Sequence, residues 1–278
     1  MRLSILMDNN TFIDQYFLGE PAFSCFIEAD EKKFLFDVAY SDAFLTNAEG
    51  LGIDLHHLDA VIISHGHLDH TWGLPHLMKY FTADTQPDMN FSKPALIAHP
   101  ATFTSRKTKT REEIGPNTTP DELSEWFDIK FSDLPVQLSE NLFFLGEIPR
   151  VTNFEADKPL GKVVSKNGES PDFLFDDSAL VYRAVGGLVI ITGCSHSGIC
   201  NIVEYAMKVM DETRVVDIVG GLHLLNPSKN QLDKTLDYLK KLNPGMMHAC
   251  HCTDLKSKVA LANAITIGEV GSGLVLNY

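Results

Sequence analysis

Residues 60–74 have the sequence AVIISHGHLDHTWGL, and this stretch decides how the rest of the chain is interpreted. Its first half is a short apolar run of the kind found in strands that are buried on both faces. Three histidines and an aspartate follow at once, as His65, His67, Asp69 and His70. Imidazole and carboxylate groups are tolerated together beside a buried strand when a cation holds them. The stretch therefore predicts one half of a metal site.

The spacing of these residues suits two ions. In extended or loop backbone, residues two apart project to the same side, so His65 and His67 can meet one ion. Asp69 and His70 begin the following turn and can face a second ion nearby. Nitrogen and carboxylate ligands suit Zn²⁺, and also Mn²⁺ or Fe²⁺. Four ligands do not complete two sites, so later segments must supply the others; the alternative is a polar loop whose histidines are solvated.

Later strand ends offer the missing ligands. The sequence TGCSHSG at 192–198 follows an apolar run and offers Cys194 and His196. His251 ends another predicted strand and can reach a site at that edge. Asp177 precedes a strand and could complete a metal site, although a turn is an equally good interpretation.

Residues that could contact a substrate are less sharply marked. His223 follows two glycines that let a ligand approach the backbone, and its role stays open between substrate contact, metal contact and structural hydrogen bonding. Arg150, Lys158 and Lys162 are candidate anion contacts, although charges on a loop are usually solvated. They lie in the segment 147–176, which has little periodicity and the length of a lid or a disordered loop.

The order of predicted elements indicates the architecture. A strand-rich first third with one or two helices is mirrored by the last third, and both place metal-type residues at strand ends. This predicts an α/β protein with two β-sheets packed face to face, helices outside each sheet and a site along one edge. We expect a single domain over 1–278, with a lid or insertion within 104–176.

Composition limits the partners. The chain has 44% hydrophobic and 22% charged residues, as ordinary globular proteins do, and its formal net charge is −14. That charge disfavours nucleic acid and anionic membranes, so we expect a small-molecule substrate. No apolar run reaches the roughly 20 residues of a membrane span, and the N-terminus has no secretory pattern. The five cysteines, an odd number, favour reduced thiols in a cytoplasm over a disulfide framework.

The sequence SHGHLDH, followed by Gly73 and Leu74, resembles the HxHxDH signature of the metallo-β-lactamase superfamily. The resemblance implies a four-layer αββα sandwich with a dinuclear metal centre at its edge. It also implies that His65 and His67 bind one metal, and that Asp69, His70 and His251 bind its neighbour.

Most of the chain also resembles one branch of that superfamily. The resemblance is carried by EIPRVTNFE, DDSALVYRAVGGLVIITGCSHSGICNI, GGLHLL and HACHCTD. The branch is that of 7,8-dihydropterin-6-methyl-4-(β-D-ribofuranosyl)aminobenzene-5′-phosphate synthase, similar to dihydropteroate-type synthases that join a pterin methyl diphosphate to an arylamine. One departure matters: TGC at 192–194 stands where TGD is expected, so Cys194, His196 or Asp177 must replace a bridging aspartate.

These observations favour a metal-dependent enzyme, either a hydrolase or a pterin-type transferase, acting on a small phosphorylated or ring-containing substrate. Two divalent ions, most simply zinc, would be its cofactors, and Asp69 would hold metal or orient water. An alternative is a non-catalytic ligand or metal sensor on a degenerate site. A serine-type nucleophile within GCSHS is a weaker alternative, because it leaves SHGHLDH unexplained.

Overall fold

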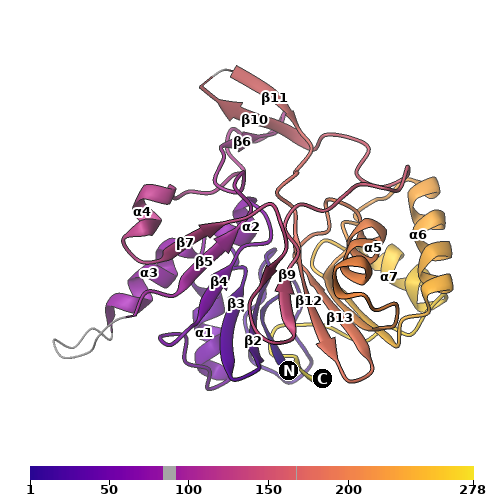
Figure 1. The fold of residues 1–278 in the computed structure, drawn as a ribbon, viewed down its shortest axis with the longest axis horizontal. Coiled ribbons are helices and arrows are strands. Elements are labelled where there is room, and N and C mark those ends of the chain that lie inside the picture. The colour runs from indigo at the N-terminus through magenta and orange to yellow at the C-terminus, as the bar shows by residue number, and fades with distance from the viewer. Residues whose placement is uncertain (84–91, 167) are drawn as a thin grey trace.

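The computed structural model describes residues 1–83, 92–166 and 168–278. It confirms the predicted architecture: two β-sheets pack face to face, and helices cover the outer face of each sheet (Figure 1). The N-terminal part of the chain builds most of one half of this sandwich and the C-terminal part builds the other, except that the last strand, β16 (Val275–Asn277), joins the first half. The two termini lie close together at one end, where the Met1 amino group donates to the Tyr278 carbonyl at 2.8 Å.

The first sheet has seven strands and combines both ends of the chain. β1 pairs antiparallel with β16 and β2, whereas β3, β4, β5 and β7 run parallel to one another. The strands lie in the order β16 (Val275–Asn277), β1 (Arg2–Met7), β2 (Ser24–Ala29), β3 (Lys32–Phe36), β4 (Ala60–Ile62), β5 (Ala95–Ala98) and β7 (Asp128–Phe131).

The second sheet has six strands. β13, β14 and β15 are parallel, and β12 turns back antiparallel between β13 and β9. The strands lie in the order β15 (Met246–Cys250), β14 (Val215–Gly221), β13 (Gly187–Thr192), β12 (Ala179–Ala184), β9 (Leu142–Phe144) and β8 (Val136–Gln137).

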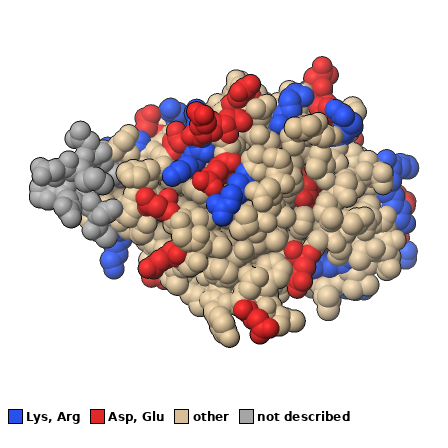
Figure 2. Space-filling model, turned by 90° about the horizontal axis from the view of Figure 1, so that it is seen from below, with Lys and Arg blue, Asp and Glu red and all other residues tan. Residues whose placement is uncertain are grey.

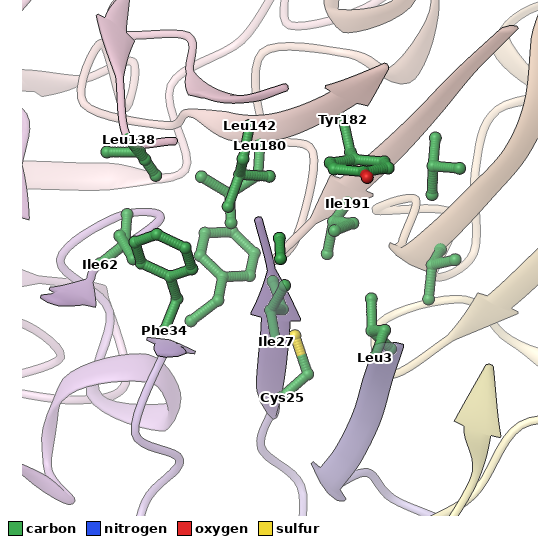
Figure 3. Packing of buried hydrophobic residues seen from close by; sticks show 14 of the residues in the cluster. Leu3, Cys25, Ile27, Phe34, Ile62, Leu138, Leu142, Leu180, Tyr182 and Ile191 are labelled. Carbon is green, nitrogen blue, oxygen red and sulfur yellow. The ribbon is translucent and has the colours of Figure 1, made fainter. Parts of the chain in front are cut away.

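Apolar side chains from both sheets fill the space between them. Leu3, Ile27 and Phe34 of the first sheet point toward Leu180 and Ile191 of the second, and all five are buried (Figure 3). Each sheet also has an apolar outer face. The strands are therefore buried on both sides, as their continuous apolar runs predict.

Helices close those outer faces. The first sheet is covered by helices that contribute Phe44, Leu74 and Phe81 to its outer cluster, and the second by α5, which contributes Ile199 and Ile202. Ser228 and Asp254 cap α6 and α7 by accepting from backbone N–H groups of the first turn, which satisfies donors that a helix start leaves unpaired. The helices are α1 (Ala43–Gly50), α2 (Leu68–Thr71), α3 (Leu74–Ala83), α4 (Pro120–Ser124), α5 (Ile199–Met210), α6 (Lys229–Leu242) and α7 (Leu255–Ala262). In the described part of the chain, no helix has the length and apolar character needed to cross a membrane.

A third, small sheet stands apart from the sandwich. It consists of β11 (Gly168–Asp172), β10 (Gly161–Ser165) and β6 (Arg106–Lys107). The segment 147–176 therefore contains a β-hairpin, which the sequence does not predict. Its strands are only partly buried and mostly polar, so they lack the alternation that identifies a strand.

The strands that lead into the predicted ligand segments end at one edge of the sandwich. β1, β3 and β4 of the first sheet and β13, β14 and β15 of the second all finish there, because these strands run in common directions within their sheets. α2, which follows β4, lies on this same side, and the small sheet stands above it at the top of Figure 1. The fold thus brings the predicted histidine segments together, under the small sheet.

Candidate metal centre

The loop after β4 gathers the first histidines. His65 Nε2 and His67 Nδ1 lie 3.1 Å apart, and His67 ends the extended backbone at the start of α2. Gly66 between them is required by packing, because a Cβ there would lie 1.9 Å from the Thr102 carbonyl oxygen. The loop is therefore held against its neighbours in the shape that turns both imidazoles inward.

Two groups of ligand-type side chains meet at this edge. The first contains Asp69, His70, Cys194 and His251, whose ligand atoms lie within 4.8 Å of one another. Within it, Asp69 Oδ2 lies 3.4 Å from His251 Nε2 and 3.7 Å from His70 Nε2. Cys194 Sγ lies 3.3 Å from His70 Nε2.

The second group contains His65, Cys194 and His196, again within 4.8 Å. His67 stands beside it, with its ring centroid 4.8 Å from that of His196. Cys194 belongs to both groups. The residue that replaces the expected aspartate in TGC thus occupies the position between the two halves, where a bridging ligand would sit.

Outer residues fix which nitrogen each ring presents to the groups. Ser64 Oγ donates to Asp37 Oδ2 at 2.7 Å, so at 2.9 Å from His65 Nδ1 the hydroxyl must accept, and His65 Nε2 keeps its lone pair. Asp37 Oδ2 likewise accepts from His70 Nδ1 at 2.6 Å. Asn9 Oδ1 accepts from His251 Nδ1 at 3.2 Å. The Nε2 atoms of His65, His70 and His251 therefore face the centre. Hydrogen-bond partners on the outer nitrogen orient metal-binding histidines in the same way.

The spacing of the donor atoms fits tetrahedral metal. Two nitrogens on one zinc ion lie about 3.3 Å apart, because each Zn–N bond is about 2.0–2.1 Å, and a sulfur and a nitrogen lie about 3.5 Å apart. The 3.1 Å between His65 and His67 and the 3.3 Å between Cys194 and His70 are close to these values. The buried Nε2 atoms of His196 and His251 have no hydrogen-bond partner. A pair of divalent ions suits this mixed nitrogen, sulfur and oxygen set.

The electrostatics of one group favour neutral ligands. Burial, reinforced by neighbouring histidines, lowers the pKa of His65 and His196 well below the usual histidine value, and burial lowers that of His67 to about 3. These rings are neutral at pH 7, which is the form that binds metal.

In the group of Asp69, His70, Cys194 and His251, carboxylates favour the protonated form of the histidines. Although burial works the other way, the nearby Asp69 carboxylate, 3.4 Å from His251 Nε2, raises the pKa of His251 to about 9. Asp37 and Asp69 similarly outweigh burial and raise the pKa of His70. Burial raises the pKa of the Cys194 thiol, so a bound cation would have to stabilise its thiolate.

Backbone strain is concentrated at the same edge. Asp37, Ser195, His223 and His251 all have φ between 49° and 61°, a left-handed conformation that costs non-glycine residues energy. Each follows the end of a strand that leads into the cluster. The strain is tolerated because the surrounding contacts fix each side chain in place.

Two other candidates lie elsewhere. Asp177 accepts from the Ser197 backbone and hydroxyl at 2.8 and 2.5 Å, and it belongs to neither ligand group. Arg150 donates to the backbone carbonyls of Ala156, Phe173 and Leu174, and its guanidinium lies 4.8 Å from the centre of the Phe175 ring. Asp177 thus holds the loop that follows His196, and Arg150 fastens the segment 147–176 through its backbone carbonyls.

A cleft of about 600 Å³ opens over the cluster. His223 lines it, and its Nδ1 is buried without a hydrogen-bond partner, while its backbone N–H donates to Cys252 Sγ at 3.2 Å. His223 therefore has a buried ring nitrogen without a protein partner at the wall of the cleft. The walls include His67, Asp69, Cys194, His196, His251, Cys252 and Lys258.

Sequence reasoning missed the outer residues. Asp37 organises both Ser64 and His70, and Asp8 accepts from the His251 backbone N–H at 2.8 Å. Asp176 accepts from the Gly66 backbone N–H at 2.8 Å. A usable signal exists for Asp8 and Asp37: each directly follows an apolar strand that ends at this edge.

Comparison with known proteins agrees with this geometry. A family model described as the metallo-beta-lactamase superfamily matches residues 19–251. The uncharacterized protein MJ0448 of Methanocaldococcus jannaschii is 29% identical over 275 residues, covering 97% of this chain and 98% of its own. The 7,8-dihydropterin-6-methyl-4-(beta-D-ribofuranosyl)-aminobenzene-5′-phosphate synthase of the same organism is 31% identical over 257 residues, covering 87% and 84%.

Solved structures add the fold. Tm1679, described as a metal-dependent hydrolase of the beta-lactamase superfamily, superposes with a TM-score of 0.84 at 29% identity, covering 100% of this chain and 99% of its own. Zinc-bound PqqB from Methylobacterium extorquens shares the fold, with a TM-score of 0.58 at 13% identity and full coverage of both chains. By sequence and by structure, the chain belongs to the metallo-beta-lactamase superfamily.

Proposed function

We propose that this chain is a metal-dependent enzyme that joins a pterin methyl diphosphate to an arylamine at a dinuclear centre. The observation that carries the proposal is the convergence of two ligand groups on Cys194 at the floor of an open cleft. The resemblance of most of the chain to a pterin-pathway synthase supports this reaction over others. In it a C–N bond forms, a C–O bond breaks, diphosphate leaves and the arylamine nitrogen loses a proton.

The chain's residues would divide the work. His65, His67 and His196 would hold one ion, Asp69, His70 and His251 the other, and Cys194 both. Ions held there would supply Lewis-acid stabilisation of negative charge that develops on the departing oxygen.

Residues around the ions would position the reactants. The free Nδ1 of His223 can hydrogen-bond a polar group of the substrate above the cluster. Asp69, which is less buried than its neighbours, can accept a hydrogen bond at the cleft floor. Asp37, Ser64 and Asn9 keep the rings in their productive tautomers, so that no reorganisation is needed during the reaction.

Hydrolysis is the second candidate. It is favoured by the close superposition on Tm1679, described as a metal-dependent hydrolase. The same cleft would then admit water in place of the arylamine. The two reactions differ in one product, since hydrolysis releases the pterin alcohol and transfer releases the coupled amine.

The test begins with elemental analysis of purified protein. Two equivalents of zinc, manganese or iron are expected. If the protein holds no metal after careful aerobic and anaerobic preparation, the metalloenzyme hypothesis is refuted in favour of a non-catalytic ligand sensor. The metal-loaded protein is then incubated with the pterin methyl diphosphate, with and without the arylamine. Coupled product supports transfer, pterin alcohol alone supports hydrolysis, and the absence of both rejects the pterin substrate.

A further inference from the structure

A second hollow leads from the metal cluster to the small sheet. It has a volume of about 500 Å³, within the roughly 300–1,000 Å³ of small-molecule sites. His67 and Asp69 line its inner end, and Arg111 and Leu160 its outer end. Pro21, Tyr40, Leu68 and Ile114 complete the walls, which are largely apolar.

Tyr40 gives this hollow a flat wall. Its side chain is 42% exposed, and its ring stacks on Trp72 with centroids 5.2 Å apart and an angle of 19° between planes. Trp72 is itself anchored, because its indole N–H donates to the Gly115 carbonyl at 2.8 Å. An exposed aromatic ring that is held from behind offers its other face to a planar ligand ring.

The hollow continues into a third one on the small sheet. This outer hollow has a volume of about 570 Å³, and Leu160 lines both. The segment 107–111 also spans them, since Lys107 to Thr110 line the outer hollow and Arg111 lines the inner one. The remaining walls of the outer hollow come from Pro159, Gly161, Lys162 and Glu169.

The outer hollow carries surplus positive charge on a protein whose net charge is −14. Lys107 and Lys162 share a single carboxylate, Glu169. Among the residues that the structure describes, Lys109 and Arg111 have no ion-pair partner. At the end of the molecule away from the small sheet, acidic and basic side chains stand next to one another (Figure 2).

We propose that Lys109 and Arg111 form an anion subsite that binds a phosphate monoester at the far end of the substrate. The planar ring of the substrate lies against Tyr40, and its reacting atom lies at the metal cluster. A ring joined to the phosphate by a sugar would span the two connected hollows. The inference rests on the proposed function for the orientation of the substrate, and it adds residues that select for a remote phosphate.

The experiment uses a ligand pair that differs only in the phosphate. Adenosine 5′-monophosphate and adenosine, each a planar ring on ribose, are titrated calorimetrically into the full-length protein, both metal-loaded and chelator-treated. The monophosphate should bind at least ten-fold more tightly than adenosine in both forms. Lys109→Ala/Arg111→Ala should remove most of that preference and leave adenosine binding unchanged, whereas Tyr40→Ala should weaken both ligands.

Lys130→Ala is the matched control, because Lys130 is an exposed lysine on β7 with a nearby carboxylate at 3.5 Å. Equal affinity for the two ligands, or an unchanged preference in the double variant, would overturn the subsite. These outcomes are separable from failure of the proposed function. A protein without metal or product can still prefer the monophosphate, and a protein with both can lack the preference.

Discussion

Replacing Arg106 by methionine should destabilise the protein and weaken metal binding together. Among the described residues, Arg106 is one of the largest fully buried side chains, with an exposed fraction of 1%. Its Nη2 lies 2.7 Å from Asp176 Oδ1 and its Nε 3.0 Å from Asp172 Oδ2. Asp176 Oδ2 in turn accepts from the Gly66 N–H between His65 and His67. The arginine thus connects the small sheet to the metal-binding loop.

The magnitude follows from what the substitution leaves behind. Removing one partner of a buried ion pair costs about 3–5 kcal/mol, because the remaining charge is buried without compensation. Here two carboxylates lose the same cation, so we expect a loss near 4 kcal/mol. For a chain of this size that corresponds to a fall in Tm of about 8–16 °C, at about 2–4 °C per kcal/mol. Disturbing an outer partner of metal ligands also lowers metal affinity about 10- to 100-fold.

Urea unfolding of chelator-treated protein measures the first effect, and competition with a chromophoric zinc chelator measures the second. The triple variant Arg106→Met/Asp172→Asn/Asp176→Asn should recover a large part of the stability, because it leaves no buried charge unpaired. Lys130→Met is the surface control. A single variant that loses less than about 1 kcal/mol, or a triple variant less stable than the single one, would refute the ion-pair reasoning.

Three further changes test the centre and its surroundings. His67→Ala should abolish retention of at least one metal equivalent, measured by elemental analysis, whereas the exposed His57→Ala should retain both; unchanged metal in His67→Ala would contradict the assignment. Asp37→Asn replaces an acceptor for His70 and Ser64 by an amide, so zinc affinity in the chelator assay should fall about 10- to 100-fold, and a fall of less than two-fold would show that the outer contacts do not matter. Glu155 is buried at the start of α5, where burial outweighs its hydrogen bonds from Cys200 and Asn201 and raises its pKa above the usual 4.5. Its folded pKa exceeds its unfolded pKa, so stability is lost as pH rises from about 4.5 through the folded value, and Glu155→Gln should gain stability relative to wild type over that window in urea unfolding; a difference that does not vary with pH would count against this.

The ligand segments are predictable because they depend on local pattern. Short apolar runs identify β4, β13 and β15, and the polar residues that follow a buried strand must lie at a sheet edge. Histidines at the ends of three such strands are therefore expected to lie close together in one shared site. That logic places His65, His196 and His251 at one edge before any coordinates are known.

The outer contacts and the small sheet are not predictable in this way. Asp37 acts through Ser64 and His70, and the pairing of these residues depends on how β3 and β4 align, which no local spacing reveals. Arg106 stands in a basic, polar stretch that resembles a solvated loop. Its burial arises only when Asp172 and Asp176 arrive from a segment more than sixty residues away.

The two-residue strand β6 links the proposed subsite to the centre. Successive side chains of a strand point to opposite faces, so Arg106 turns inward to Asp176 while Lys107 turns outward to Glu169 and the outer hollow. A ligand in the outer hollow, which Lys107 lines, would therefore lie on the opposite face of β6 from the metal centre. Asp176, which pairs with Arg106, also accepts from the Gly66 backbone N–H in the loop that carries His65 and His67. Phosphate recognition and metal positioning are thus expected to support each other through Arg106, without direct contact between them.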